Sequence, residues 1–332
     1  MPTHNICPDG DTTLTLTTTN PPTKLLVSSH HLIHASPYYR ALLTGPFREA
    51  SILRANGTVN ITLTDDNTAA MIAVMNAVHG RFFSVPGRKI KLELLKDIAV
   101  VVDKYELFES VSTMLHTWAS TVRVGNPRAS LMDVAKWLLC VTWAFNMSDA
   151  FRFATKELVL DTGMNVEVEG TCVPLNVGAR ITRRRAALLQ TVRSRIQRFR
   201  DAEYRHSAVC TVYCDDLVHE KLDEILGLLS KGPRSGVKPR IIRKMVHDLY
   251  EHRMDGHQVI ENCANRYVYV PPLCIRLLED LDMDIGREFD RVTGMILGRY
   301  KGDAKRRVDW MGGDVGLDAK ALWPYGQHPE AS

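Results

Sequence analysis

Histidines give the N-terminal part of the chain its first candidate for chemistry. His30, His31 and His34 fall within five residues, and imidazole is a common metal ligand and general base. A histidine pair at four-residue spacing offers only two ligands, and no neighbouring cysteine or carboxylate completes a tetrahedral site. We therefore predict that these histidines lie at the rim of a packed surface and hold no metal.

A second group combines histidine with cysteine. His206, Cys210 and Cys214 recur every four residues, which would place them on one face of a helix. The first and the last would stand roughly 12 Å apart along the axis, so one zinc ion cannot bind all three. Two interpretations stay open: partly buried thiols, or a zinc site formed by Cys210 and Cys214 with His219 or His257. We predict the former, with no metal and no other cofactor.

Signatures of enzymatic chemistry are absent from the sequence. No G-x-S-x-G, G-x-x-x-x-G-K-[ST], H-E-x-x-H or strand-linked G-x-G-x-x-G pattern occurs. The adjacent acids Asp65 and Asp66 precede a helical pattern, where carboxylates serve the cap and the helix dipole more often than acid-base catalysis. We predict that the protein is not an enzyme and has no catalytic residues.

The sharpest electrostatic feature is a run of arginines. Eight arginines and no acidic residue stand between Arg180 and Arg200, interleaved with apolar residues at helical spacing. Such a run is either a solvated helix face or a signal for nuclear targeting, an acidic partner or nucleic acid. No base-reading module accompanies it, so nucleic acid is not expected. The predicted basic patch comprises Arg183, Arg184, Arg185, Arg193, Arg195, Arg198 and Arg200.

Composition narrows the remaining classes of protein. The 332 residues carry a formal net charge of +4, with 45% hydrophobic and 24% charged residues, values typical of a folded globular chain. The sequence shows neither a signal peptide nor an apolar run of eighteen residues, so no membrane association is expected. Seven scattered cysteines favour free thiols in a reducing compartment. We expect an intracellular protein of the cytoplasm, the nucleus or both.

Residue patterns predict strands followed by helices over the first block. Residues 12–17 and 23–28 read as two strands joined by a turn, and serines indicate helix starts near Ser28 or Ser29 and after Ser36. Asn56-Gly57 predicts a turn before another strand. The expected later elements are a strand at 58–63, an acid-capped helix at 64–80, an extended segment at 81–87, and helices at 91–107 and 108–120.

The second block is almost entirely helical in pattern. Asn126 is placed to cap a helix that begins at Pro127, and Ser148 is placed to cap another. The expected helices lie at 130–146, 149–160, 182–208, 215–229 and 240–252. The predicted domains are residues 1–124, a helical domain at 125–300, and a loosely ordered basic tail at 301–332.

The first block resembles a BTB/POZ domain, in the divergent form found in filamentous-fungal proteins. The resemblance covers residues 11 to about 120, through the segments "DTTLTL", "SSHHLIHASPYYRALL", "GPFREA", "VNITLTDDNTAAMIAVMNAVHG" and "LLKDIAVVVDKYEL" in the family's order. Ser28 and Tyr39 stand where the animal pattern has histidine and phenylalanine. The stretch "CVTWAFNMSDAFRFATKELVLDTG" resembles the start of the BACK-like helical region that often follows. The implied fold class is an α+β domain, a small sheet flanked by a helix cluster, followed by a mostly α-helical domain.

The same resemblance points to partner-binding residues. BTB domains that recruit cullin scaffolds carry an apolar-x-acid motif where Phe47 and Glu49 stand. The alternative is that Phe47 closes the core after the Gly45-Pro46 turn and that Glu49 is only solvated. Leu32 and Tyr39 are expected to be buried beside the rim that borders the family's dimer surface, and are further candidate partner-binding residues.

Two functions follow from the resemblance, and both are non-enzymatic protein–protein interaction functions. As a substrate adaptor for a cullin-type ubiquitin ligase, the protein would bind a cullin with its first domain and a client with its helices. As a BTB scaffold or transcription-linked nuclear factor, it would form a homodimer, or a heterodimer with another BTB protein, and use the arginine-rich helix for acidic partners. A fold alone does not decide between them.

Overall fold

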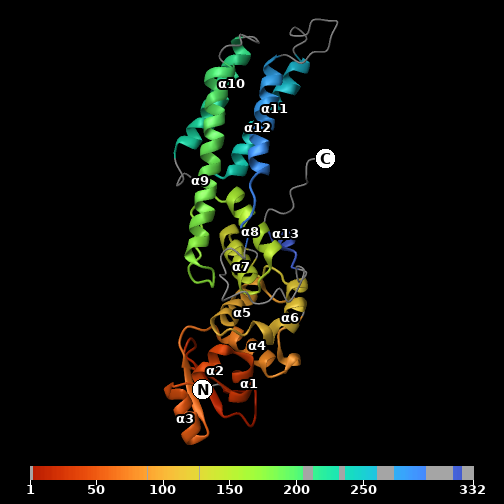
Figure 1. The fold of residues 1–332 in the computed structure, drawn as a ribbon. Coiled ribbons are helices and arrows are strands. Elements are labelled where there is room, and N and C mark those ends of the chain that lie inside the picture. Colours follow the sequence, from red (N-terminus) through yellow and green to blue (C-terminus); the bar gives the residue numbers. More distant parts are fainter. Residues whose placement is uncertain are drawn as a thin grey trace. The chain divides into compact units, whose positions relative to one another are not determined.

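The computed structural model describes residues 3–87, 89–126, 128–204, 212–231, 236–259, 273–296 and 317–323. Helices predominate in it beside one small sheet, so the chain is α+β (Figure 1). The chain divides into two compact units. The first comprises Met1–Ala154, Val168–Val173 and Ile296–Ser332, and the second comprises Thr155–Glu167 and Pro174–Met295. The domain boundaries predicted from the sequence stay predictions.

The sheet belongs to the first unit and has four strands in the order β1-β3-β2-β4. β2 pairs antiparallel with β3 and parallel with β4, and β1 pairs parallel with β3. Burial alternates along β2, β3 and β4, so one face of these strands packs inward, and the strands predicted at 12–17, 23–28 and 58–63 are confirmed. The strand bounds are Thr3–Asn5 (β1), Thr12–Leu16 (β2), Thr23–Val27 (β3) and Val59–Leu63 (β4).

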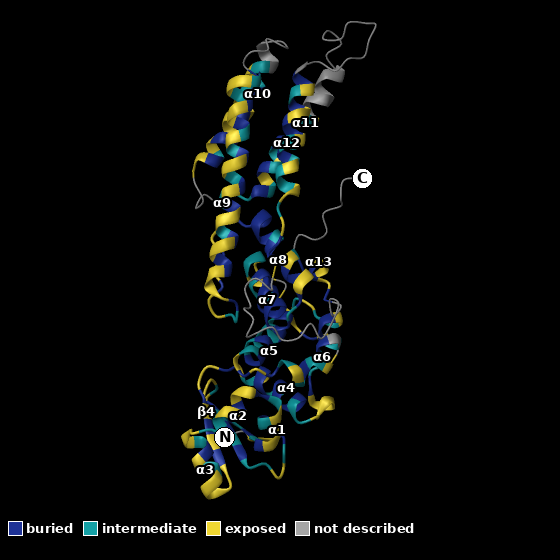
Figure 2. Cartoon of the chain, viewed as in Figure 1, coloured by how far each residue is buried: buried dark blue, intermediate teal, exposed yellow. Residues whose placement is uncertain are grey.

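Helices contribute most of the buried apolar residues of the first unit, as the dark blue residues in Figure 2 show. The sequence patterns did not predict β1 or α3, and the segment expected to be extended at 81–87 contains a 3-10 turn. The helices are α1 (Ser29–Ala35), α2 (Pro37–Thr44), α3 (Arg48–Asn56), α4 (Thr68–Val78), η1 (Phe82–Ser84), α5 (Leu92–Lys104), α6 (Phe108–Thr121), α7 (Leu131–Ala144) and α8 (Ser148–Asp161), whose last residues enter the second unit.

The start of helix α1 is capped by the carboxylate of Asp11, the residue before β2, and not by a serine side chain. Ser28 occupies the cap position without a side-chain cap bond. Instead the Ser29 N–H and Oγ donate to the two oxygens of Asp11, at 2.7 and 2.5 Å. Burial alone would raise the pKa of Asp11, but the hydrogen bonds from Ser29 outweigh it and hold that pKa below its usual value. The predicted serine cap is thus replaced by a residue distant in sequence.

Three other helix starts test the predicted caps. Ser36 caps α2 as expected, accepting a bond from the Tyr39 N–H at 3.0 Å. Asn67, and not an acid, caps α4 by accepting from the Ala70 N–H. Ser130 caps α7 through a reciprocal bond pair with Asp133, whereas Asn126 accepts from the Arg128 N–H in a turn before the helix. The predicted acid cap of α4 was therefore wrong by one residue, and the predicted cap Asn126 lies four residues before the actual cap of α7, Ser130.

The second unit is built from long helices. Along α9 and α12 the buried residues form one stripe with exposed residues opposite, as an amphipathic pattern requires (Figure 2). The helix predicted at 182–208 begins earlier, directly after Pro174, and continues as a π-helix from Phe199. The sequence patterns did not predict α12. The elements are α9 (Leu175–Arg198), η2 (Phe199–Tyr204), α10 (Val212–Ser230), α11 (Pro239–Val259) and α12 (Leu273–Asp290).

Two distant segments complete the first unit. The thiols of Cys140, on α7, and Cys172 lie 2.9 Å apart, which joins the segment 168–173 to α7. Within the predicted tail, the short helix α13 (Ala319–Leu322) is followed by Trp323, which is buried and meets the ring of Phe153 edge to face. The described part of that tail is therefore packed against the unit.

Candidate interaction surfaces

The loop between α2 and α3 presents an exposed aromatic side chain. Phe47 is 48% exposed and caps α3, its carbonyl oxygen accepting the Ser51 N–H at 3.2 Å. Gly45 ends α2 by donating to the Ala41 carbonyl at 2.9 Å. A Cβ on Gly45 would lie only 2.4 Å from that same oxygen, so the turn requires glycine. Phe47 is thus held between two helix ends and does not close the core.

Leu32 and Tyr39 lie elsewhere. Both have no exposed surface in this chain, so they pack the core and offer no contact to a partner in this structure. The Tyr39 ring stacks on Tyr105 with centroids 5.2 Å apart. Its hydroxyl is buried and has no hydrogen-bond partner in the described part of the chain. Burial, followed by the charge of Asp66, holds the pKa of Tyr39 far above its ordinary value.

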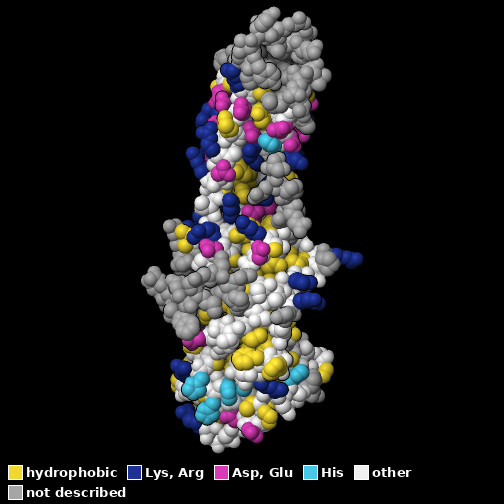
Figure 3. Space-filling model, turned by 90° about the vertical axis from the view of Figure 1, so that its right-hand side faces the viewer, with side chains coloured by type: hydrophobic (Ala, Val, Ile, Leu, Met, Phe, Trp, Pro, Cys, Tyr) yellow, Lys and Arg dark blue, Asp and Glu magenta, His cyan; other side chains and the backbone are white. Residues whose placement is uncertain are grey.

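The N-terminal histidines do lie at a surface. His30, His31 and His34 on α1 are exposed, and Figure 3 shows a group of histidine side chains on the surface of the first unit. No group of three or more His, Cys, Asp or Glu side chains is placed to hold a metal ion among the described residues. His206 and Cys210 lie outside the described residues, as do the side chains of Cys214 and His257, so the zinc alternative stays a prediction.

His79 stacks on one of these histidines, and burial favours its neutral form. Its ring stacks on His31 at 4.7 Å. The Ser28 N–H donates to Nε2 at 3.0 Å, so Nε2 carries no proton and Nδ1–H donates to the Met75 carbonyl at 2.8 Å. Burial lowers the pKa of His79 most; the hydrogen bond to Met75 raises it in part, and the neighbouring His31 and Arg81 lower it further.

This neutral histidine predicts a pH-dependent stability for the first unit. The unfolded chain takes up a proton on His79 near pH 6.5, but the folded chain does so only at lower pH. Between the two pKa values the unfolded state binds more protons, so the free energy of unfolding falls as pH drops below about 6.5 and levels off below the folded pKa. Urea unfolding at pH 8 and pH 5.5 measures this fall. His79→Gln is expected to flatten it, whereas His30→Gln, on the exposed face of α1, is expected to leave it unchanged.

The predicted basic patch divides into engaged and unengaged arginines. Arg185 is fully buried and donates to the Met164 carbonyl, so it is not part of a solvent-facing patch. Arg184 donates to the Thr293 carbonyl at 2.8 Å, and Arg200 pairs with Asp223 at 2.9 Å. Within the described part of the chain, three arginines of the patch make no hydrogen bond or ion pair: Arg183, Arg193 and Arg198.

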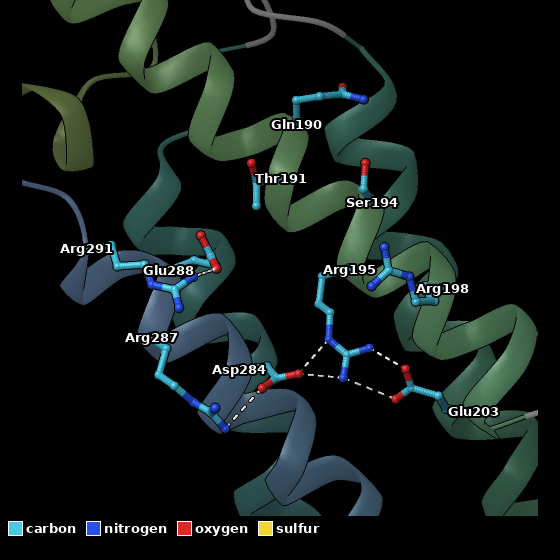
Figure 4. A pocket seen from close by; sticks show the side chains of 10 residues that line it. All are labelled: Gln190, Thr191, Ser194, Arg195, Arg198, Glu203, Asp284, Arg287, Glu288 and Arg291. Atoms are coloured by element: carbon cyan, nitrogen blue, oxygen red, sulfur yellow. Dashed lines mark hydrogen bonds and ion pairs between the residues drawn. The ribbon is translucent and has the colours of Figure 1, made fainter.

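A polar cleft of about 580 Å³ lies in the second unit, between α9 and α12 (Figure 4). One wall is a face of α9 and the other is a face of α12, with Glu203 of η2 at one end. Every lining side chain is polar or charged: Gln190, Thr191, Ser194, Arg195, Arg198, Glu203, Asp284, Arg287, Glu288 and Arg291.

Ion pairs fix the floor and the far wall of this cleft. Arg195 lies between two carboxylates, with Nε 2.7 Å from Asp284 and Nη2 3.2 Å from Glu203. Arg287 meets the same Asp284 at 3.0 Å, while Arg291 pairs with Glu288. The pairs raise the pKa of Arg195, the hydrogen bond with Glu203 contributing most. Each acid of the lining is therefore already neutralised by an arginine.

Comparisons with known proteins leave the site geometry as the main guide to function. No family model, no curated protein and no solved structure matches the chain. Among the described helices, none combines the length and the apolar character that crossing a membrane would require.

Sequence patterns had marked Phe47 and the α9 arginines, but they missed the α12 wall. A signal for α12 was present, because the apolar residues Ile275, Leu278 and Ile285 recur at helical spacing.

Proposed function

We propose that the protein is a non-enzymatic interaction protein, with a BTB/POZ-like first unit that docks a cullin-type ubiquitin-ligase scaffold through Phe47. The observation that carries the proposal is the exposed aromatic side chain of Phe47, held at the junction of two helices. An aromatic anchor that is already ordered loses little conformational entropy on binding, and such residues dominate the energy of many interfaces.

The surroundings of Phe47 support a docking role. The half-buried Glu49 lies in the first turn of α3, one residue beyond the exposed Arg48, so two charged residues follow the aromatic residue directly. Interfaces commonly combine an apolar anchor with a charged rim that sets orientation more than affinity. Phe47 would therefore supply most of the binding energy, and Glu49 would select the partner.

The order of the sheet and helices also supports the proposal. Strands β2 and β3, the paired helices α1 and α2, strand β4 and helices α4 and α5 follow one another as the BTB/POZ resemblance implies. Helix α3 stands where the resemblance places the partner-binding loop. The helices of the second unit would then bind a client protein.

Binding of a purified cullin N-terminal domain tests this function. Phe47→Ala is expected to weaken binding by at least about tenfold, because it removes the aromatic anchor. Glu49→Ala is expected to weaken it less, because a solvated rim charge contributes about 1 kcal/mol or less. Isothermal titration calorimetry or fluorescence anisotropy measures both effects.

A matched control is available in the same unit. Phe83, in η1, is an equally large exposed aromatic residue, so Phe83→Ala removes the same side chain from another surface. It is expected to leave cullin binding unchanged. Equal weakening by Phe47→Ala and Phe83→Ala, or no binding by the unaltered protein, would reject the docking role of Phe47.

A scaffold that self-associates and binds acidic partners is the second candidate function. The unengaged arginines of α9 and the polar cleft beside them favour it. Both functions use the second unit to hold a partner, and they differ in what the first unit binds. A protein that binds no cullin but forms a stable dimer in analytical ultracentrifugation would support the scaffold.

A further inference from the structure

We propose that the cleft between α9 and α12 binds an acidic segment of a partner protein, as an extended peptide whose anionic oxygens contact Arg198. This inference rests on the proposed interaction function and identifies the kind of client that the second unit takes. The starting point is a set of exposed donor residues on the α9 wall. Their side chains make no hydrogen bond or ion pair within the described part of the chain: Gln190, Thr191, Ser194 and Arg198.

The chemistry of the lining selects an anion. Hydroxyl, amide and guanidinium groups donate hydrogen bonds, and the arginine cannot lose its charge at any physiological pH. Four arginines face three carboxylates in the lining, which leaves one net positive charge. Because Asp284, Glu203 and Glu288 are all paired, that excess belongs to Arg198, the lining arginine that has no ion pair among the described residues.

That charge lies near a hydroxyl group in the lining of the cleft. Ser194 and Arg198 are four residues apart and so share one face of α9. Long helical side chains lean toward the N-terminus of their helix, and Figure 4 draws Arg198 and Ser194 on the same side of α9. A carboxylate or phosphate oxygen can therefore accept from the guanidinium and the hydroxyl together, as charge-assisted bonds favour.

The opposite wall adds hydrogen-bond donors without closing the cleft. Arg287 and Arg291 are 62% and 71% exposed, and each uses a guanidinium edge on a carboxylate three residues earlier on α12. A guanidinium carries five N–H donors, so donors remain for a second anion. Acidic groups spaced along one chain could thus contact α9 and α12 in turn.

The size of the cleft fits a short extended peptide. Its volume of about 580 Å³ lies in the range of small-ligand sites. From Gln190 to Arg198 the wall runs roughly 12 Å along the helix axis, the length of about four residues of extended chain. Among the described residues no apolar side chain lines the cleft, so an amphipathic helix, which needs an apolar groove, does not match it.

Charge reversal at two positions of α9 tests the site. Arg183 and Arg198 are both exposed, both lack an ion pair in the described residues and both lie on α9, but only Arg198 lines the cleft. The probe is a fluorescein-labelled ten-residue peptide of alternating glutamate and serine, titrated with the full chain in an anisotropy assay. Arg198→Glu is expected to raise the Kd at least about tenfold and Arg183→Glu less than about threefold. Arg198→Gln, which removes the charge without reversing it, is expected to fall between them.

Further peptides identify the source of the anion. The same peptide with glutamine in place of glutamate is expected not to bind, and one with phosphoserine in place of glutamate is expected to compete for the Arg198-dependent site. Equal weakening by Arg183→Glu and Arg198→Glu would show attraction to the whole helix and overturn the site. Binding of inorganic phosphate or single-stranded RNA that depends on Arg198, without binding of either anionic peptide, would overturn the peptide assignment.

The outcome can be separated from that of the proposed docking function. Phe47→Ala changes a side chain of the first unit and is expected to leave peptide binding intact, while Arg198→Glu is expected to leave cullin binding intact. A protein that binds cullin but not the acidic peptide would refute this inference alone. Loss of cullin binding alone would refute the docking role and leave the peptide site standing.

Discussion

Asp66→Ala is expected to lower the free energy of unfolding of the first unit by about 2–4 kcal/mol, the combined cost of a lost buried charged hydrogen bond and a small cavity. The Asp66 side chain is only 1% exposed, and it accepts the Tyr105 hydroxyl at 2.6 Å and the Lys104 ammonium at 2.9 Å. Tyr105 is itself buried, so water cannot replace the lost acceptor. Lys104 is 42% exposed and regains water, so the ion pair itself contributes little. Urea unfolding followed by fluorescence reports on this unit, which contains the buried Trp118.

Two tyrosine variants separate the hydrogen bond from ring packing. Tyr105→Phe removes the donor to Asp66 and is expected to destabilise the unit by about 1–2 kcal/mol. Tyr39→Phe removes a hydroxyl that has no partner in the described residues, so it is expected to cost nothing and to be slightly stabilising. If Tyr39→Phe and Tyr105→Phe destabilised the unit equally, the assigned role of Asp66 would be wrong.

The same network connects the core to the proposed docking loop. Ser36 donates to the Tyr105 carbonyl at 2.5 Å and also caps α2, the helix that ends at the turn before Phe47. Asp66 therefore holds α2 in place through Tyr105, although it lies far from the docking surface in sequence. This explains why the position next to a helix start is an acid: its side chain serves the core, and Asn67 serves the cap.

Residue patterns within a few neighbouring positions predicted the strands, helices and caps that depend on nearby residues alone. Alternation in residues 59–63 gave the buried face of β4, and the apolar stripe of Leu92, Leu95 and Ile98 gave the buried face of α5. Ser36 was predicted correctly because its cap bond spans only three residues. Helix α3 was missed because it buries only Ala50 and so shows little apolar periodicity.

Contacts between distant residues account for what the sequence could not predict. Asp11 holds the start of α1 from eighteen residues away, and no local pattern marks it as a cap. Arg185 resembles its neighbours Arg183 and Arg184 in sequence, but the helix turns it inward, where it is fully buried. The α9–α12 cleft depends on pairing Arg195 with Asp284, which lies 89 residues later. A charge pattern can mark a basic helix, but it cannot identify which arginine lacks a partner.

Gly163→Ala is expected to destabilise the second unit by about 2–3 kcal/mol, because it overpacks a contact between two backbone segments. A Cβ at this position would lie 2.0 Å from the Gly236 carbonyl oxygen and 2.4 Å from its carbon, far closer than van der Waals contact. The segment cannot move away freely, because the buried Arg185 donates to the neighbouring Met164 carbonyl. Far-UV circular dichroism during urea unfolding follows the helices of both units, and the tryptophan fluorescence of the first unit distinguishes the two transitions.

Gly227→Ala provides the matched comparison, since it adds the same methyl group to the same unit. Gly227 lies on the exposed face of α10, and a Cβ there would meet nothing within 4 Å. Alanine has a higher helix propensity than glycine, so this variant is expected to stabilise the unit by about 0.5–1 kcal/mol. Opposite signs for the two variants would assign the effect of Gly163→Ala to steric overlap with Gly236. Destabilisation by both would instead point to a general intolerance of added volume, because helix propensity predicts the reverse at Gly227.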